Sequence, residues 1–350
     1  MKTFELLPAE LLHLILVWLP PRESQRLAEL NWTIKSVVRS SHFATLSLDR
    51  HLTPETTRQF VGGPCDADRL WFTWPAHLQR AYAARLNNNI EQMRWGLYFD
   101  RTLSLRIPSG IGCVISLTHL DLKGNGLTGP LLDEFGFLRA VKVVNLGDNC
   151  LTGCIPSSFG SLAKLECLVL SKNCLSGCIP ASLGHLTIVQ QLDLSSNKLS
   201  GLIPIEITQC TKLWSLNMSR NCLSGPLPDS ISNLADLEDL NCSFNSLSGP
   251  LPGSISRLSK LEQLHLEENE LSGNIPTLFG SLANLRTLNL KHNNLEGVIP
   301  VQSLNALSSL WSLELGGNNL EAPVLHESQQ ETMHPLRPHV MALLKYAFGK

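Results

Sequence analysis

The chain has 350 residues and a formal net charge of −2 at pH 7. Apolar residues make up 43% of it, a share close to that of globular proteins, which argues against a disordered chain and against a membrane protein. Lysine and arginine are spread along the sequence, which argues against nucleic acid as a partner, because that role calls for a concentrated basic face.

A short helix is predicted over residues 7–20, which read LPAELLHLILVWLP. Leu7, Leu11, Ile15 and Leu19 recur at helical spacing, and Pro8 suits the first helical turn. The apolar run is too short to span a bilayer, which needs about 20 apolar residues. We therefore expect a small helical head over residues 1–45 and no membrane span.

The same stretch resembles the F-box. That family opens with Leu-Pro-x-Glu and continues with Ile-Leu-x-x-Leu. The matching positions are Leu7, Pro8, Glu10, Ile15, Leu16 and Leu19. The resemblance implies docking on the Skp-type adaptor of a cullin-RING ubiquitin ligase. The adaptor contacts would come from Leu7, Pro8, Leu11, Ile15, Leu16 and Leu19. The alternative is a helical cap packed on the rest of the chain.

The location of the chain follows from the same region. Lys2 precedes an apolar stretch, as in a secretory signal, but Glu5 and Glu10 interrupt it, and no small-x-small cleavage site follows Leu19. We therefore expect a cytoplasmic or nuclear protein, in which the ten cysteines are mostly free thiols.

Residues 46–92 are predicted to form a helical connector or N-terminal cap. Trp71, Phe72 and Trp74 cluster within it. Such a cluster usually seals the end of a hydrophobic core.

One motif repeats through residues 93–325. Eight asparagines are spaced 24 residues apart and a ninth follows after 25: Asn125, Asn149, Asn173, Asn197, Asn221, Asn245, Asn269, Asn293 and Asn318. Around each lies L-x-x-L-x-L-x-x-N-x-L, followed by a G-x-I-P-like element. Nine units in register, with a degenerate one before them, predict a solenoid; residues 326–350 would be a C-terminal cap or tail.

These motifs resemble the plant-type leucine-rich repeat, over about residues 117–320. The x-L-x-L-x alternation predicts a short strand with inward leucines, and stacked coils would form one parallel sheet on a concave face. Each asparagine offers one acceptor and two donors, so we expect a hydrogen-bond ladder between coils. An apolar plug follows ten residues later: Phe135, Phe159, Leu183, Ile207, Ile231, Ile255 and Phe279. Ser303 breaks that column and Leu304 follows it, which locates the extra residue.

Two of the repeats carry cysteine pairs, in CLTGCIP and CLSGCIP. Adjacent coils are about 5 Å apart, so we expect Cys150 beside Cys174 and Cys154 beside Cys178. That spacing permits disulfides, but a reducing compartment argues against them, and a redox or metal role stays open.

The outward positions of the strands form the predicted partner-binding face. The candidate contact residues are Asp121, Asp193, Trp214, Asn217, Arg220, Asp239, Phe244, His265 and Glu267. Serines fill the middle of this face: Ser171, Ser195, Ser215, Ser219 and Ser243. Arg220 beside Phe244 is the best candidate anchor, because these residue types dominate binding hot spots. The alternative is that these side chains only cover the leucines beneath.

No Walker loop, H-E-x-x-H or G-x-S-x-G motif is present, so we expect no enzyme, cofactor or metal. The leading hypothesis is a substrate-recognition subunit of a ubiquitin ligase that holds an unidentified protein or peptide client on the concave face. The alternatives are a scaffold or signalling solenoid without a ligase link, and a secreted or receptor-like recognition protein.

Overall fold

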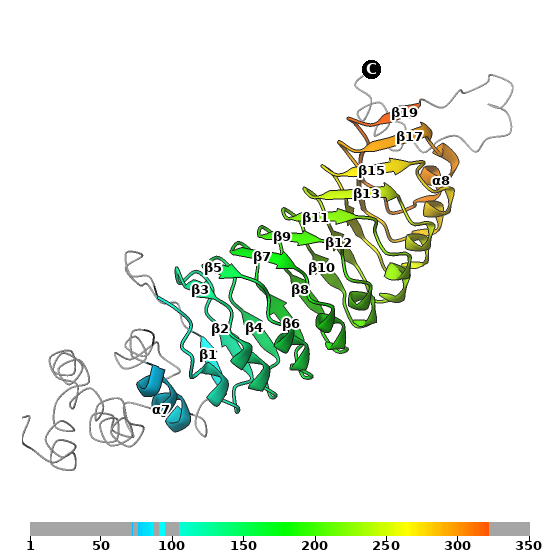
Figure 1. Ribbon diagram of the computed structural model, residues 1–350. Helices are drawn as coiled ribbons and strands as arrows, with labels where there is room; N and C mark the ends of the chain where they lie inside the picture. Colours follow the sequence, from blue (N-terminus) through cyan, green and yellow to red (C-terminus); the bar gives the residue numbers. More distant parts are fainter. Residues whose placement is uncertain (1–71, 73–75, 87–90, 95–104, 322–350) are drawn as a thin grey trace, which may run out of the picture.

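The computed structural model describes residues 72, 76–86, 91–94 and 105–321. Within them the chain winds into an elongated stack of coils, preceded by helix α7 (Ala76–Leu86) (Figure 1). The predicted head, most of the connector and residues 326–350 lie outside the described residues. The domain boundaries therefore remain predictions.

A ten-stranded parallel sheet runs the length of the stack. Its strands are β1 (Gln92–Arg94), β2 (His119–Asp121), β4 (Val143–Asn145), β6 (Cys167–Val169), β8 (Gln191–Asp193), β10 (Ser215–Asn217), β12 (Asp239–Asn241), β14 (Gln263–His265), β16 (Thr287–Asn289) and β18 (Ser312–Glu314). From β2 to β16, partners are 24 residues apart, as where Leu216 pairs with Leu240. The predicted strand period is confirmed.

A second sheet, of nine parallel strands, was not predicted. Its strands are β3 (Thr128–Pro130), β5 (Cys150–Gly153), β7 (Cys174–Cys178), β9 (Lys198–Gly201), β11 (Cys222–Gly225), β13 (Ser246–Pro250), β15 (Glu270–Gly273), β17 (Asn294–Val298) and β19 (Asn319–Glu321). Strands β5 to β17 of this sheet each have one inward leucine, such as Leu151, and then a glycine with positive φ, such as Gly153 at 79°. A single apolar residue gives no alternation, so the pattern alone did not reveal this sheet.

Short 3-10 helices close the third side of each coil. They are η2 (Ile111–Cys113), η3 (Asp133–Phe137), η4 (Ser157–Ser161), η5 (Ala181–His185), η6 (Ile205–Gln209), η7 (Asp229–Asn233), η8 (Gly253–Arg257) and η9 (Thr277–Ser281). The predicted plugs lie in η3 to η9, all at 0 or 1% exposure. Neighbouring helices are so close that a Cβ on Gly160 would collide with the carbonyl of Ser182.

The coil with the extra residue differs as predicted. It replaces the 3-10 turn with α8 (Val301–Ala306), and Leu304 is its buried plug. One added residue lets the tight turn relax to α-helical pitch.

The asparagine ladder is present. The Asn173 Oδ1 accepts a hydrogen bond from the Leu151 N–H at 3.0 Å, and its Nδ2 donates to the Leu146 and Leu170 carbonyls at 3.0 Å each. The same set recurs along the stack, for example at Asn269. Backbone groups that the strands leave unpaired are thereby satisfied.

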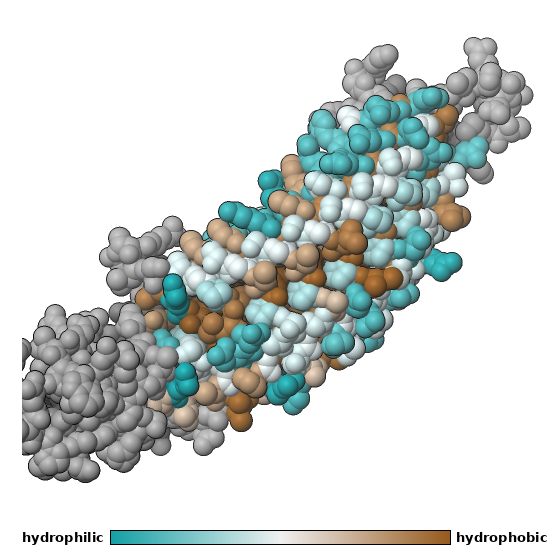
Figure 2. Space-filling view, viewed as in Figure 1, coloured by the Kyte–Doolittle hydropathy of each residue, from teal (hydrophilic) through white to brown (hydrophobic). Residues whose placement is uncertain are grey.

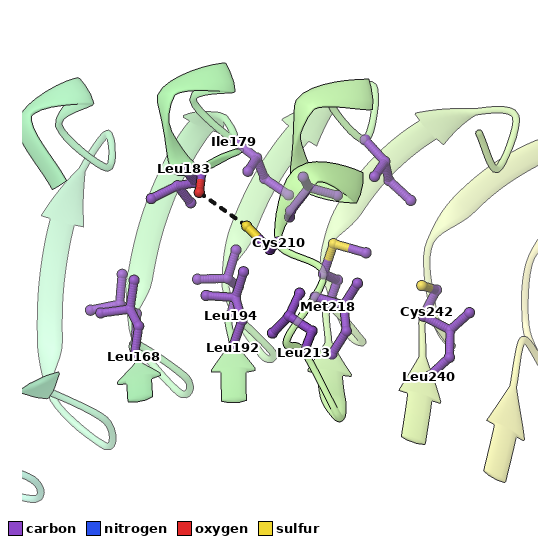
Figure 3. Packing of buried hydrophobic residues seen from close by; sticks show 14 of the residues in the cluster. Leu168, Ile179, Leu183, Leu192, Leu194, Cys210, Leu213, Met218, Leu240 and Cys242 are labelled. Atoms are coloured by element: carbon purple, nitrogen blue, oxygen red, sulfur yellow. Dashed lines mark hydrogen bonds between the residues drawn. The ribbon is translucent and has the colours of Figure 1, made fainter. Parts of the chain in front are cut away.

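Leucines fill the interior, with sulfur at a few of their positions (Figure 3). Met218 and Cys242 stand where other coils have the second strand leucine, and both are fully buried. The Cys210 Sγ donates to the Leu183 carbonyl at 3.3 Å. Burial raises the pKa of Cys210 to about 11 and that of Cys242 to about 12. These thiols are therefore packing groups, not nucleophiles.

The N-terminal end of the stack is covered. Tyr82 of α7 is fully buried, and the Ser109 N–H donates to the Gln79 Oε1 at 3.0 Å. Phe72 is buried too, as predicted, whereas Trp71 and Trp74 lie outside the described residues. The first coil is longer than the others, because 27 residues separate Gln92 from its partner His119.

Candidate binding face

All the predicted partner-contact residues lie on the outward side of the ten-stranded sheet or in the turns beside it. We call this surface the ten-stranded face. Four of these residues end a strand: Asp121 in β2, Asp193 in β8, Asn217 in β10 and His265 in β14. Asp239 begins β12, and Trp214 comes directly before β10. The other three lie in the turns after a strand: Arg220 after β10, Phe244 after β12 and Glu267 after β14. Asp121 is separated from the others by β4 and β6. The remaining eight gather between β8 and β14.

Arg220 and Phe244 form the predicted contact. The guanidinium carbon of Arg220 lies 4.2 Å from the centroid of the Phe244 ring, a cation–π arrangement, and Phe244 is 37% exposed. Both residues have left-handed backbones, with φ of 56° and 55°. That conformation costs an L-residue about 1–2 kcal/mol. The same turn position is glycine at both ends of the stack, in Gly124 and Gly317.

A second cluster joins β12 to β14. The Glu267 Oε2 lies 3.8 Å from the His265 Nδ1, and the Asp239 Oδ2 accepts a long hydrogen bond of 3.5 Å from Ser215. Yet the Asp239 Oδ1 and the Glu267 Oε2, both shielded from solvent, receive no hydrogen bond from the described part of the chain. Burial raises the pKa of Asp239, with a smaller contribution in the same direction from the Asp193 charge.

The serines predicted to fill the middle of this face are buried. Ser171, Ser195, Ser215, Ser219 and Ser243 are all at most 9% exposed. The Ser219 hydroxyl donates to the Asn217 Oδ1 at 2.8 Å, and Ser195 and Ser243 repeat that bond on Asp193 and Asn241. Ser195, Ser219 and Ser243 therefore stabilise the turns. A serine two places after an Asn or Asp that ends a strand is the sequence signal for this role.

The character of the face changes along the stack. Strands β4 and β6 present Val143, Cys167 and Val169 on this face, whereas β12 and β14 present Asp239 and His265. Figure 2 shows the same trend over the viewed surface, with apolar residues over the middle coils and hydrophilic ones gathered at the C-terminal coils. The most apolar part of the face is therefore at β4 and β6, and β12 and β14 are polar.

The cysteine prediction is wrong in its register. In the nine-stranded sheet Thr152, not Cys150, lies opposite Cys174, because partners here are 22 residues apart. Equivalent residues of adjacent coils are thus two positions out of line, and their Cα atoms are about 8 Å apart. That exceeds the range a disulfide accepts. All nine described cysteines are free, and no group of described His, Cys, Asp or Glu side chains is arranged to hold a metal.

Comparison with known families decides the class of the chain. A family described as "Leucine rich repeat" matches residues 115–175 and 168–223, and a second of that description matches 236–258, 260–282 and 284–305. The chain is a leucine-rich-repeat protein. The predicted solenoid is confirmed, and leucine-rich repeats of this kind are protein-interaction modules, typically without enzymatic activity. No F-box is found, and the residues of the F-box-like match lie outside the described residues.

Several solved structures are similar. The leucine-rich-repeat ectodomain of the plant membrane receptor kinase GASSHO1/SCHENGEN3 from Arabidopsis thaliana, in complex with CASPARIAN STRIP INTEGRITY FACTOR 2, is 33% identical (TM-score 0.64) over 76% of this chain and 32% of that one. The Arabidopsis receptor kinase HAESA, in complex with the peptide hormone IDA and the co-receptor SERK1, is 32% identical (TM-score 0.61) over 68% and 39%. A plant ice-binding protein is 28% identical (TM-score 0.54) over 66% and 74%. No curated protein matches the sequence.

These comparisons correct the predicted location. The chain spans about a third of the GASSHO1/SCHENGEN3 structure, and that structure is the ectodomain of a membrane receptor. A second similar structure is a plant peptide hormone receptor in complex with RGF2. The prediction of a cytoplasmic or nuclear protein is therefore wrong, and the similarity points to an extracellular location. None of the helices in the described residues is long and apolar enough to cross a membrane.

Proposed function

We propose that the chain is an extracellular, receptor-like recognition module that holds a peptide or an extended protein segment on its ten-stranded face. The observation that carries this proposal is the exposed Arg220–Phe244 pair at the centre of that face, at 4.2 Å. Aromatic and arginine side chains in such positions dominate binding hot spots. Support comes from two of the similar structures: one is described as a plant peptide hormone receptor in complex with RGF2, and the other as a receptor kinase in complex with the peptide hormone IDA.

The ubiquitin-ligase hypothesis has less support. It rests on residues 7–19 alone, and the family comparison finds no F-box. The receptor-like alternative explains the same solenoid and agrees with the ectodomain similarity, so it replaces the ligase as the leading proposal.

The left-handed backbone conformation of Arg220 and Phe244 makes a sharp test possible. Phe244 has φ 55°, and glycine occupies the same turn position in Gly124 at φ 71°. Phe244→Gly therefore removes the ring and relieves backbone strain, which offsets the entropy that glycine adds to the unfolded chain. We expect the variant to fold with nearly unchanged stability.

The experiment captures peptides from an extracellular fluid on the purified full chain and identifies them by mass spectrometry. Wild type and Phe244→Gly are compared with Lys172→Gly, a matched control in the same turn of another coil, at φ 55°. We expect Lys172→Gly to keep the captured set and Phe244→Gly to lose it. Identical sets from all three proteins, or none, would overturn the proposal.

Two glycosylation sequons on this face give an independent check. Asn217-Met218-Ser219 and Asn241-Cys242-Ser243 lie within the binding region, and a glycan matters only in an extracellular chain. The Asn217 and Asn241 side chains are half-buried and hydrogen-bonded to their own sequon serines. We expect peptide mapping of the mature protein to find both asparagines unmodified. Glycans on both would block the face and contradict the proposal.

A further inference from the structure

Two carboxylate oxygens of the ten-stranded face receive no hydrogen bond, and they indicate the chemistry of its ligand. Resting on the proposed function, we infer that the C-terminal half of this face binds an extended segment that carries two basic side chains, one received by Asp239 and the other by Glu267. Nothing in the repeat requires either residue: the positions equivalent to Asp239 hold Ser215 and Gln263, and that of Glu267 holds Ser243.

The first step of the argument is hydrogen bonding. The Asp239 Oδ1 and the Glu267 Oε2 are buried from solvent and receive no donor from the described residues. A buried acceptor without a partner costs about 1–3 kcal/mol. Neither side chain is fully buried, so a change of rotamer would bring these oxygens to the open face, where a ligand can satisfy them. Ammonium and guanidinium groups are the donors that carboxylates bind most strongly.

The second step is charge. Two of the cations beside the strands of this sheet already have carboxylate partners: Lys142 contacts Glu166 at 3.1 Å, and Arg286 contacts Glu262 at 2.7 Å. Arg220 is engaged with the Phe244 ring. His265 is the basic group beside Glu267, 3.8 Å from its Oε2, and it also acts electrostatically on Asp239. Asp193 adds a further negative charge that acts on Asp239, so the local field favours a positively charged ligand over an acidic one.

The third step is spacing. Asn241 lies opposite His265 in the sheet, with Asp239 two residues before Asn241 and Glu267 two residues after His265. The two carboxylate residues are therefore about 14 Å apart at their Cα atoms, from strand rise and strand spacing. In an extended segment that distance separates side chains four residues apart, which lie on the same side. The exposed ring of Phe244 is beside Glu267, since the Phe244 N–H donates to the Glu267 carbonyl at 2.9 Å.

The test uses an array of synthetic extended peptides that carry two arginines at varied spacings, with matched arrays in which citrulline or glutamate replaces arginine. The purified full chain is the probe. We expect binding to peak at arginines four residues apart and to be weak for citrulline and glutamate. No preference for arginine, or no dependence on spacing, would overturn the inference.

Variants distinguish specific binding at Asp239 and Glu267 from general electrostatic attraction to the face. Asp239→Asn combined with Glu267→Gln should weaken the best arginine peptide by about tenfold or more. Glu314→Gln is the matched control: it removes a carboxylate from the same face, but from β18, which β16 separates from β14. An equal loss in Glu314→Gln would show charge attraction only and refute the site.

The outcome is distinguishable from failure of the proposed function. If Phe244→Gly abolishes capture of natural peptides while the arginine array shows no preference, the face binds a ligand of different chemistry. If neither experiment shows binding, both proposals fail. Thermal melts of every variant, compared with wild type, exclude misfolding as the cause.

Discussion

Replacing one ladder asparagine should destabilise the whole stack, and Asn173→Ala is the clearest case. Its amide makes three strong contacts at 3.0 Å, accepting from the Leu151 N–H and donating to the Leu146 and Leu170 carbonyls. Alanine leaves the Leu151 N–H buried without a partner, at about 1–3 kcal/mol, and two carbonyls each lose a bond of about 1 kcal/mol. We expect the free energy of unfolding to fall by about 3–5 kcal/mol.

The measurement is urea unfolding followed by circular dichroism. Asn284→Ala is the matched control, because this exposed amide makes one bond, to the Ser259 carbonyl at 2.8 Å; we expect it to cost less than about 1 kcal/mol. Native-state hydrogen exchange should show that Asn173→Ala loses protection in neighbouring coils too, since each coil is stable only against its neighbours. A loss in Asn173→Ala no larger than that of the control would refute the ladder as a main source of stability.

Three further predictions concern the core, the thiols and pH. Phe159→Ala should lower the free energy of unfolding by about 3–5 kcal/mol in urea unfolding, because the ring is fully buried with its centroid 5.2 Å from that of Phe135; a loss below about 1 kcal/mol would contradict this packing. A thiol reagent at mildly alkaline pH should label the exposed cysteines of the nine-stranded sheet quickly, but Cys210 and Cys242 only after unfolding, as peptide mapping can show. Because burial raises the pKa of Asp239, the folded chain binds its proton more tightly than the unfolded chain, so this group lowers stability as pH rises through the folded pKa. Asp239→Asn should then melt at or above wild type at neutral pH and lose that advantage in acid; a lower melting temperature at neutral pH would show that the carboxylate is structural.

The sequence by itself determined the repeat and what the repeat requires. We could predict the 24-residue spacing of the asparagines, the inward leucines and the plugs such as Phe135, because a solenoid imposes the same environment on every coil. Even the irregular coil at Leu304 could be located by its broken column. The face that carries Arg220 and Phe244 followed from strand alternation alone.

The tertiary structure decided what depends on the offset between coils. The second sheet pairs residues 22 apart, so Cys150 is out of line with Cys174, whereas the ten-stranded sheet pairs residues 24 apart along most of its length. Sequence spacing could not separate the two registers, because both sheets share one period but cross the stack at different angles. Nor could it tell which polar side chains the fold uses: the serines of the face are bound by neighbouring Asn and Asp, whereas Asp239 and Glu267 keep buried oxygens without donors. That difference depends on atomic positions within each turn, and it is why the candidate ligand chemistry came only from the fold.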